Sequence, residues 1–171
     1  KYRDDSTRDI AAMMLELDAD AVAVSELDSC NRRNPVYQLE AFAEALGGWN
    51  YRYGSAMQWN GGAYGDGVVT GKRINRSYIV ELPKGSGYEP RVCVVVETKD
   101  YVVAQAHLDH SVDAVRVEQA RLLTDELKRL YGRSRKPVFL CGDLNTLPGG
   151  PVIRQLCEDW TVLSEQAATY P

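Results

Sequence analysis

The sequence predicts an α/β sandwich built from mixed, largely antiparallel sheets. Segments with the spacing of amphipathic helices alternate with short runs rich in valine, isoleucine and tyrosine. Antiparallel hairpins and strand–helix units occur in the same chain, and this mixture indicates the fold class. With 171 residues, of which 44% are hydrophobic and 26% charged, the chain has the composition of one globular domain.

The first third of the chain alternates helix and strand. Apolar side chains at i, i+3, i+4 and i+7 predict an amphipathic helix over residues 7–17. The run ADAVAVSE, residues 19–26, predicts a buried strand that ends near Glu26. The helical spacing returns over residues 36–46, and the pair of glycines that follows predicts the end of this second helix.

The middle of the chain is predicted to be mostly strand. The segments YGDGVVTG (64–71) and SYIVELP (77–83) are rich in β-branched and aromatic residues, which favour short strands. Residues 91–109 predict two longer strands joined by a tight turn around Lys99 and Asp100. In such a hairpin, residues whose numbers sum to about 199 lie opposite each other.

The last third returns to helices. Alanine and leucine spacing between residues 120 and 130 predicts a long helix, and PVFLCGD, residues 137–143, predicts a short buried strand. Pro151 suits the first position of a further helix that runs through Cys157, because a backbone N–H at that position would have no partner within the helix.

Charge and cysteine content limit the classes of function. A net charge of −4 and a pI near 5.2 weigh against broad neutralisation of nucleic-acid phosphates, which needs clustered Lys and Arg. The four cysteines show no CxxC spacing, so we expect buried free thiols and no zinc ribbon or disulfide scaffold. No apolar stretch is long enough to span a bilayer. An exported or periplasmic location and a cytoplasmic one both stay open.

The stretch FLCGDLNTLPGG, residues 139–150, ends a buried strand on polar residues. If the extended conformation continues past Gly142, Asp143 and Asn145 project to the same side. A carboxylate can take a proton from water, and an amide can hydrogen-bond an oxygen without adding negative charge. This pair suits hydrolysis of a phosphate ester, although the same residue types also form ordinary turns.

Other predicted strands also end on residues that carry chemistry. Glu26 ends a hydrophobic strand, where a carboxylate must be solvated or bound to an ion such as Mg²⁺. His107 ends the second strand of the hairpin, and Arg91 begins the first, so the register makes them near neighbours. Each residue alone also has a structural explanation, as a surface carboxylate, a hydrogen-bonded histidine or a surface ion pair.

Six segments, taken in order, resemble the endonuclease/exonuclease/phosphatase superfamily, which contains the DNase I-like nucleases. These segments are VSELD, YGDGVVTG, LPKGSGYEPR, AHLDH, VEQARLLTDEL and KPVFLCGDLNTLPGGPV. The set looks closest to the stand-alone bacterial phosphohydrolases of that superfamily. The resemblance implies a four-layer α/β sandwich of the DNase I-like type. It also implies hydrolysis of a phosphoester with a divalent metal, usually Mg²⁺, with Mn²⁺ as an alternative ion.

The resemblance assigns a metal ligand and a catalytic group. Glu26 matches the metal-binding Glu of the family. Asp143 and Asn145 match its GDxN pair, in which the Asp orients or activates the attacking water and the Asn contacts the phosphate. His107 matches the His at a strand end that contacts the phosphate and the leaving side. In-line attack of water on phosphorus is the implied reaction.

The resemblance also assigns substrate-binding residues and partners. Arg91 matches the Arg after the family's EP or EA pair, and Tyr64 and Asp66 match a YGN segment at the rim of the site. Asp66 stands where the family commonly has Asn, which leaves its role in doubt. The implied partner is a phosphoester substrate, whether a small molecule, a phospholipid headgroup or a nucleic acid. We expect a monomer without a membrane span.

Some parts of the family pattern do not occur in the chain. The family normally begins with a strand bearing a metal-side Asn, and it ends with an Asp-containing strand and a Ser-Asp-His turn. We therefore expect one domain over residues 1–171 that is incomplete at both ends and lacks its terminal strands.

Two other functions compete with this one. The string HLDH resembles part of the metallo-β-lactamase zinc motif, but that motif needs several more histidines and the chain has only two. The second alternative is a catalytically inactive module that uses the same fold to bind a phosphorylated ligand or a protein partner.

Overall fold

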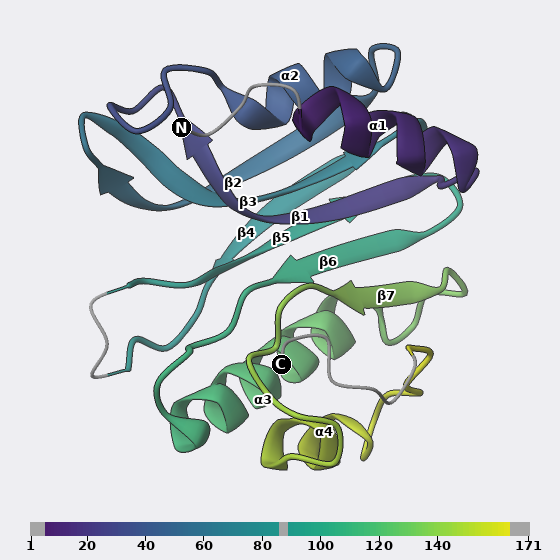
Figure 1. The fold of residues 1–171 in the computed structure, drawn as a ribbon. Coiled ribbons are helices and arrows are strands. Elements are labelled where there is room, and N and C mark those ends of the chain that lie inside the picture. Colours follow the sequence, from purple (N-terminus) through teal and green to yellow (C-terminus); the bar gives the residue numbers. More distant parts are fainter. Residues whose placement is uncertain (1–5, 86–88, 165–171) are drawn as a thin grey trace.

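The computed structural model describes residues 6–85 and 89–164. Two sheets pack face to face and helices cover both outer faces, so the chain forms four layers (Figure 1). This arrangement confirms the expected α/β sandwich. The ends of the expected domain, and the middle of the segment LPKGSGYEPR, lie outside the described residues.

The first sheet comes from one continuous part of the chain. Its strands run in the order β1-β3-β2, and both neighbouring pairs are antiparallel. Two helices cover its outer face, and the core beneath them includes Leu39, Phe42 and Val69 (Figure 1). The elements are α1 (Ser6–Glu16), β1 (Ala21–Ser29), α2 (Gln38–Ala45), β2 (Asn50–Trp59) and β3 (Gly62–Thr70).

The second sheet follows in sequence and has the order β4-β5-β6-β7. Only the β6–β7 pair is parallel, because the long helix α3 crosses over between these two strands. Helices α3 and α4 cover the outer face of this sheet (Figure 1). The elements are β4 (Arg76–Glu81), β5 (Val92–Glu97), β6 (Val102–Ala106), α3 (Asp113–Tyr131), β7 (Val138–Cys141) and α4 (Pro151–Leu156).

Most of the predicted elements are present with shifted ends. The hairpin over residues 91–109 has the expected register, since Cys93 lies opposite Ala106. Strand β2 was not predicted, although it is the partner of β3 in a second hairpin. The turn between them is Asn60-Gly61, with φ of 48° and 84°, and an Asn-Gly pair is a strong signal for this type of hairpin.

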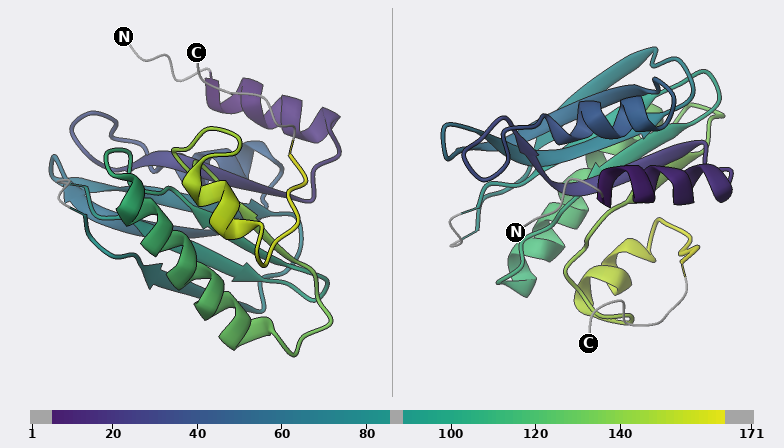
Figure 2. Two further views of the ribbon diagram at one scale, coloured as in Figure 1. Left: turned by 90° about the horizontal axis from the view of Figure 1, so that it is seen from below. Right: turned by 45° about the horizontal axis from the view of Figure 1, so that its top comes forward.

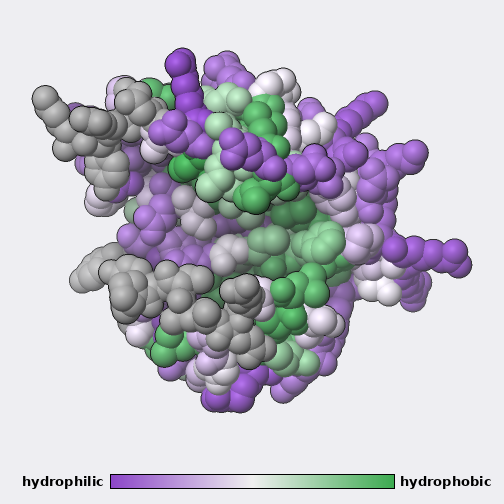
Figure 3. Space-filling view, turned by 45° about the vertical axis from the view of Figure 1, so that its right-hand side comes forward, coloured by the Kyte–Doolittle hydropathy of each residue, from purple (hydrophilic) through white to green (hydrophobic). Residues whose placement is uncertain are grey.

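Helix α1 forms where the periodicity predicts it, but most of its apolar face is open. Ile10, Met13 and Leu17 are 45%, 49% and 67% exposed, while Met14 packs on the core. Figure 3 shows apolar side chains gathered on the side of the molecule where α1 lies above the second sheet. The spacing of apolar residues therefore predicted the helix, and most of the side chains that define this spacing are exposed.

The two sheets are joined by a small apolar layer and by the ends of their strands. Val68, Val94, Val96 and Val103 are buried between the sheets. The further views in Figure 2 show the sheets stacked with α3 and α4 on the far side from α1 and α2. Across the described ranges, no helix combines the length and apolar character needed to cross a membrane.

Candidate active site

Residues from both sheets meet at one end of the sandwich. Because β6 and β7 are parallel, their carboxyl ends lie at the same edge, which places His107 and Asp143 in neighbouring loops. Arg91 directly precedes β5, whose first residues pair with the end of β6. Glu26 lies near the end of β1, which contacts β6 across the sandwich. The site therefore forms only when the two sheets are packed together.

Arg91 connects two histidines. Its Nη1 lies 3.1 Å from Nδ1 of His107, and its Nη2 lies 3.3 Å from Nδ1 of His110. The side chain is buried, and its Nη2 also pairs with Glu89 at 2.9 Å. The neighbour relation between Arg91 and His107 that the hairpin register predicted is therefore present. The ion pair with Glu89 that the structural alternative named is present as well, although the Arg91 side chain is buried.

The bond from Arg91 determines where the His107 ring carries its proton. A guanidinium only donates hydrogen bonds, so Nδ1 of His107 accepts, and the proton of the neutral ring lies on Nε2. Burial lowers the pKa of His107, and the neighbouring charge of Arg91 lowers it further, so the neutral ring is favoured. Its Nε2 lies 4.0 Å from Oδ2 of Asp143. One oxygen atom could lie within hydrogen-bond reach of both groups.

The loop after β7 turns sharply at Gly142. Gly142 has φ of 125° and Asn145 has φ of 49°, so the extended conformation ends at the strand and the pair does not share one face of it. Oδ1 of Asp143 accepts the Asn145 backbone N–H at 2.8 Å, and Nδ2 of Asn145 donates to the carbonyl of Leu108 at 2.9 Å. The turn leaves the Asp143 side chain 55% exposed beside His107, while the Asn145 amide ties this loop to the His107 loop.

Glu26 lies at an irregularity in β1. The pairing of β1 with β3 shifts between Val24 and Leu27, and Glu26 has φ of 62°. A non-glycine residue with this backbone conformation costs about 1–3 kcal/mol unless its surroundings hold it there. The bulge turns the Glu26 side chain toward solvent. Burial and Arg91 lower the pKa of His107, and the negative charge of Glu26 offsets part of that lowering. Glu26 is therefore an accessible carboxylate beside the Arg91–His107 pair.

Tyr64 and Asp66 are buried beneath the site. Their exposed fractions are 9% and 2%, which does not match the expected position at a rim. The guanidinium of Arg33 lies over the Tyr64 ring, 5.4 Å from its centre. Burial raises the pKa of Tyr64 to about 12 and that of Asp66 to about 7. Tyr64 and Asp66 are two residues apart on β3, so their side chains lie on the same face of the strand. Both are buried beneath the site.

The donor set is compatible with Mg²⁺. Among residues 6–85 and 89–164, no three His, Cys, Asp or Glu side chains are grouped so that they could hold a metal by themselves. Mg²⁺ is commonly bound by one or two carboxylates together with waters and substrate phosphates. The exposed carboxylate of Glu26 beside a histidine and an arginine fits that mode. The two histidines do not suit the zinc alternative, since Nδ1 of each ring faces the same cation, Arg91.

Three residues that the sequence analysis did not assign support the site. His110 is the second ring bonded to Arg91. Gln105 is fully buried and donates to Ser25 Oγ at 3.0 Å across the two sheets. Gln119 of α3 accepts the backbone N–H of Asp109 at 2.8 Å and so holds the loop that carries both histidines. A glutamine in the middle of the apolar strand VVAQA was the one signal available for Gln105.

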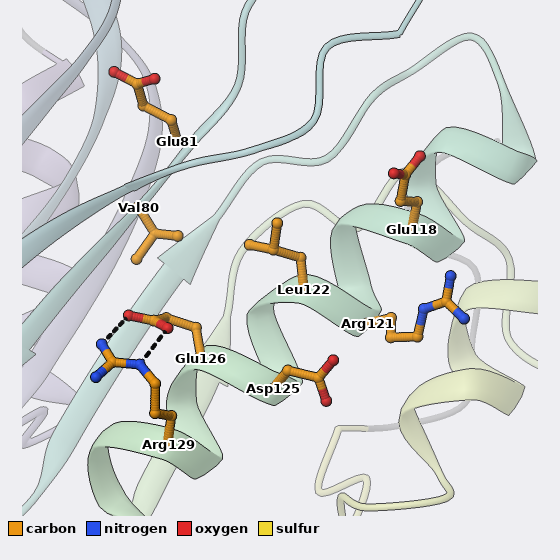
Figure 4. A pocket seen from close by; sticks show the side chains of 8 residues that line it. All are labelled: Val80, Glu81, Glu118, Arg121, Leu122, Asp125, Glu126 and Arg129. Carbon is orange, nitrogen blue, oxygen red and sulfur yellow. Dashed lines mark hydrogen bonds and ion pairs between the residues drawn. The ribbon is translucent and has the colours of Figure 1, made fainter.

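A separate hollow of about 540 Å³ lies on the outer face of the second sheet. It is found between α3 and β4, and Glu126 and Arg129 form an ion pair along one side (Figure 4). Its lining carries both charge signs and none of the residues described above. It is therefore distinct from the site at the strand ends.

Solved structures with the same fold are longer than this chain. The chain matches a mannosyl-6-phosphatase from Bacteroides thetaiotaomicron with a TM-score of 0.70 and 22% identity, covering 92% of this chain and 66% of that one. It matches the human Nocturnin catalytic domain with bound sulfate with a TM-score of 0.65 and 17% identity, and the match covers 90% of this chain and 62% of that one. It matches ANGEL2, a 2′,3′-cyclic phosphatase, with a TM-score of 0.66 and 19% identity, and the match covers 87% of this chain and 46% of that one. The chain thus spans less than two thirds of each.

The match to a family model covers almost the whole sequence. No curated protein matches the chain by sequence. The model of the endonuclease/exonuclease/phosphatase family matches residues 2–166. The four-layer fold and the order of the motifs agree with that match. The chain belongs to the endonuclease/exonuclease/phosphatase family.

Proposed function

We propose that this protein is a divalent-metal-dependent hydrolase of phosphoester bonds. The observation that carries the proposal is the meeting of Arg91, His107 and Asp143 at the strand ends, with His107 Nε2 4.0 Å from the Asp143 carboxylate. A base and a hydrogen-bond donor beside a cation are the groups that attack of water on a phosphate ester requires. The family match and the phosphatases among the similar structures support the same reaction class.

Asp143 is the proposed base for the attacking water. Its exposed Oδ2 is free of the turn bond that Oδ1 makes with Asn145, so it can accept a proton from water. His107 faces it with an Nε2–H and donates to a phosphate oxygen or to the leaving group. Arg91 keeps that proton on Nε2 and adds positive charge, and this favours the developing negative charge on phosphate.

Glu26 is the proposed ligand of Mg²⁺ or Mn²⁺. A bound divalent ion neutralises phosphate charge and lowers the barrier to attack. Glu26 supports this role by its exposure and by its position at the bulge, which keeps its carboxylate out of the apolar interior.

The test measures hydrolysis with and without Mg²⁺ on a bis-aryl phosphodiester, an aryl phosphomonoester, plasmid DNA, sphingomyelin and inositol phosphates. We expect metal-dependent turnover of one class. Asp143→Asn keeps the turn acceptor but removes the charge, so kcat should fall roughly 10²- to 10⁴-fold with an unchanged melting temperature. Asp125→Asn, an exposed position on α3, is the matched control.

The results also separate the enzyme from the binding module. Equal turnover by wild type and Asp143→Asn would contradict the assigned base. A folded protein that hydrolyses none of the substrates with either metal, but binds phosphate, would favour the inactive module instead. Turnover of DNA, lipid or a small ester identifies the substrate class directly.

A further inference from the structure

The bulge that presents Glu26 has two residues facing one. Pairing between β1 and β3 runs from Ala21 opposite Thr70 to Val24 opposite Gly67 and resumes with Leu27 opposite Gly65. Ser25 and Glu26 therefore lie across from the single residue Asp66. In such a bulge, the ladder hydrogen bonds are interrupted and a backbone N–H needs another acceptor.

Asp66 supplies that acceptor. Its Oδ1 lies 3.3 Å from the Glu26 backbone nitrogen, and the side chain is only 2% exposed. The contact reaches Glu26 through its main chain, which has φ of 62°. The buried carboxylate thus holds the strained residue from within the same sheet.

The other bulge residue is held from the opposite sheet. Gln105 of β6 is 0% exposed and donates from Nε2 to Ser25 Oγ at 3.0 Å. Its Oε1 has no hydrogen-bond partner among the described residues. Burial of a polar atom without a hydrogen-bond partner costs free energy. A glutamine buried in this way, in a strand otherwise made of valine and alanine, indicates a role that an apolar residue could not fill.

We propose that Asp66 is a positioning residue that, with Gln105, fixes the Glu26 bulge so that the Glu26 carboxylate faces the metal and the substrate. This inference rests on the proposed function and assigns Asp66 a role other than contact with substrate. An Asn at this position could take the same role, because its side-chain oxygen can also accept the Glu26 N–H.

The test compares Asp66→Ala with Asp66→Asn by two measurements. Exchange of the Glu26 amide hydrogen, followed by NMR, reports the contact itself. Calorimetric titration with Mn²⁺ reports its consequence for the metal. We expect Asp66→Ala to speed exchange and to weaken Mn²⁺ binding by about 10- to 100-fold, as loss of a supporting residue does. Asp66→Asn should keep the amide protected and stay within about threefold of wild type, with Asp125→Asn as control.

Each of the other possible results of these experiments contradicts one specific claim. Faster exchange in Asp66→Ala with unchanged Mn²⁺ affinity would mean a purely structural role. Equal loss of affinity in both variants would mean that the charge of Asp66 binds the metal, which contradicts positioning. If Asp66→Ala does not fold, Ser25→Ala decides: weaker binding supports the proposal and wild-type affinity overturns it. A wild type that binds no Mn²⁺, or a Glu26→Gln variant that binds it normally, contradicts the proposed function instead.

Discussion

At the scale of single residues, the chemistry of the site depends on which nitrogen of His107 carries a proton. Arg91 contributes twice, since it occupies Nδ1 and also holds the pKa of the ring below its ordinary value, after the larger effect of burial. The unfolded chain therefore takes up a proton at His107 at a higher pH than the folded protein. The contribution of His107 to stability is therefore complete above the unfolded pKa of about 6.5, and it is lost as the pH falls from there through the lowered pKa of the folded state.

Arg91→Met should raise the pKa of His107, because it removes the neighbouring positive charge and the donor to Nδ1. The pKa of the ring should lie below 6.5 in the wild type and should move upward in the variant. An NMR titration of the His107 ring measures the shift directly. An unchanged ring pKa in a folded variant would show that Arg91 does not control the ring.

The sequence could predict the Arg91–His107 contact but not the environment of Glu26. The contact follows from hairpin register, which the turn at Lys99 and Asp100 determines. The bulge at Glu26 depends on Asp66, forty residues away, and on Gln105 in the other sheet. A local sequence pattern contains no information about such distant partners. The apolar run of residues 19–26 therefore predicted the strand and missed the conformation of Glu26.

At the scale of elements, short loops fix the active residues to the strand ends. Gly142 connects β7 to Asp143 with φ of 125°, and a Cβ there would lie 2.1 Å from the carbonyl oxygen of Ala106. Because that oxygen belongs to the backbone of β6, it cannot move aside without disturbing the strand. Gly149 in the same loop also has a positive φ, 74°, but a Cβ there would meet nothing within 4 Å.

Gly142→Ala should therefore cost more than Gly149→Ala. We expect about 1 kcal/mol for Gly149→Ala, from the left-handed backbone alone, and about 3 kcal/mol or more for Gly142→Ala. Gly142→Ala should also lose activity, since Asp143 must shift with the loop. Urea unfolding of both variants gives the comparison, and equal losses of stability would show that the contact with Ala106 relaxes freely.

Strand β2 was missed for a different reason, which lies in its own sequence. Strand β2 alternates only in its first half, where Tyr51 and Tyr53 are half-buried and Arg52 is exposed, and the pattern is lost after Gly54, its one buried position. The Asn60-Gly61 pair was the stronger signal, because Asn-Gly predicts a hairpin turn between two strands. The hairpin over 91–109 was predicted because its residues are uniformly valine-rich and buried.

At the scale of the whole molecule, the two sheets approach each other closely at Gly54. A Cβ on Gly54 of β2 would lie 2.5 Å from Cγ2 of Val94 and 3.0 Å from Cδ1 of Ile79, both in the second sheet. The absence of a side chain at this position lets valine from the opposite sheet fill the space. The separation of the sheets, and with it the geometry of the site, depends on this contact.

Gly54→Ala should destabilise the protein by about 1–3 kcal/mol through overpacking, and Val94→Ala by a similar amount through a cavity. Together they should cost less than the sum of the two, by about 1 kcal/mol, because Val94→Ala removes the atom that Gly54→Ala would strike. A double-mutant cycle on unfolding free energies measures this coupling. Strict additivity would contradict direct packing of these two residues.

That the domain is incomplete at both ends stays a prediction. We propose it again on structural grounds, because β1 and β7 lie at the edges of their sheets and the apolar side chains of Ile10 and Met13 on α1 are 45% and 49% exposed. Long uncovered edges are uncommon in folded proteins, since they pair with other chains. The similar structures, which extend well beyond the matched region, support the same proposal.

The division of the chain between the sheets affects how the protein is made. In the part of the chain that the structure describes, the strands of the first sheet lie between Ala21 and Thr70, and those of the second lie between Arg76 and Cys141. The first sheet can therefore pair all its strands on the ribosome before the second has emerged. Asp143 follows β7, so it can reach the His107 loop only after all three strands of the first sheet have been made. The site at the strand ends therefore assembles later than the first sheet, and its formation reports that the two sheets have packed together.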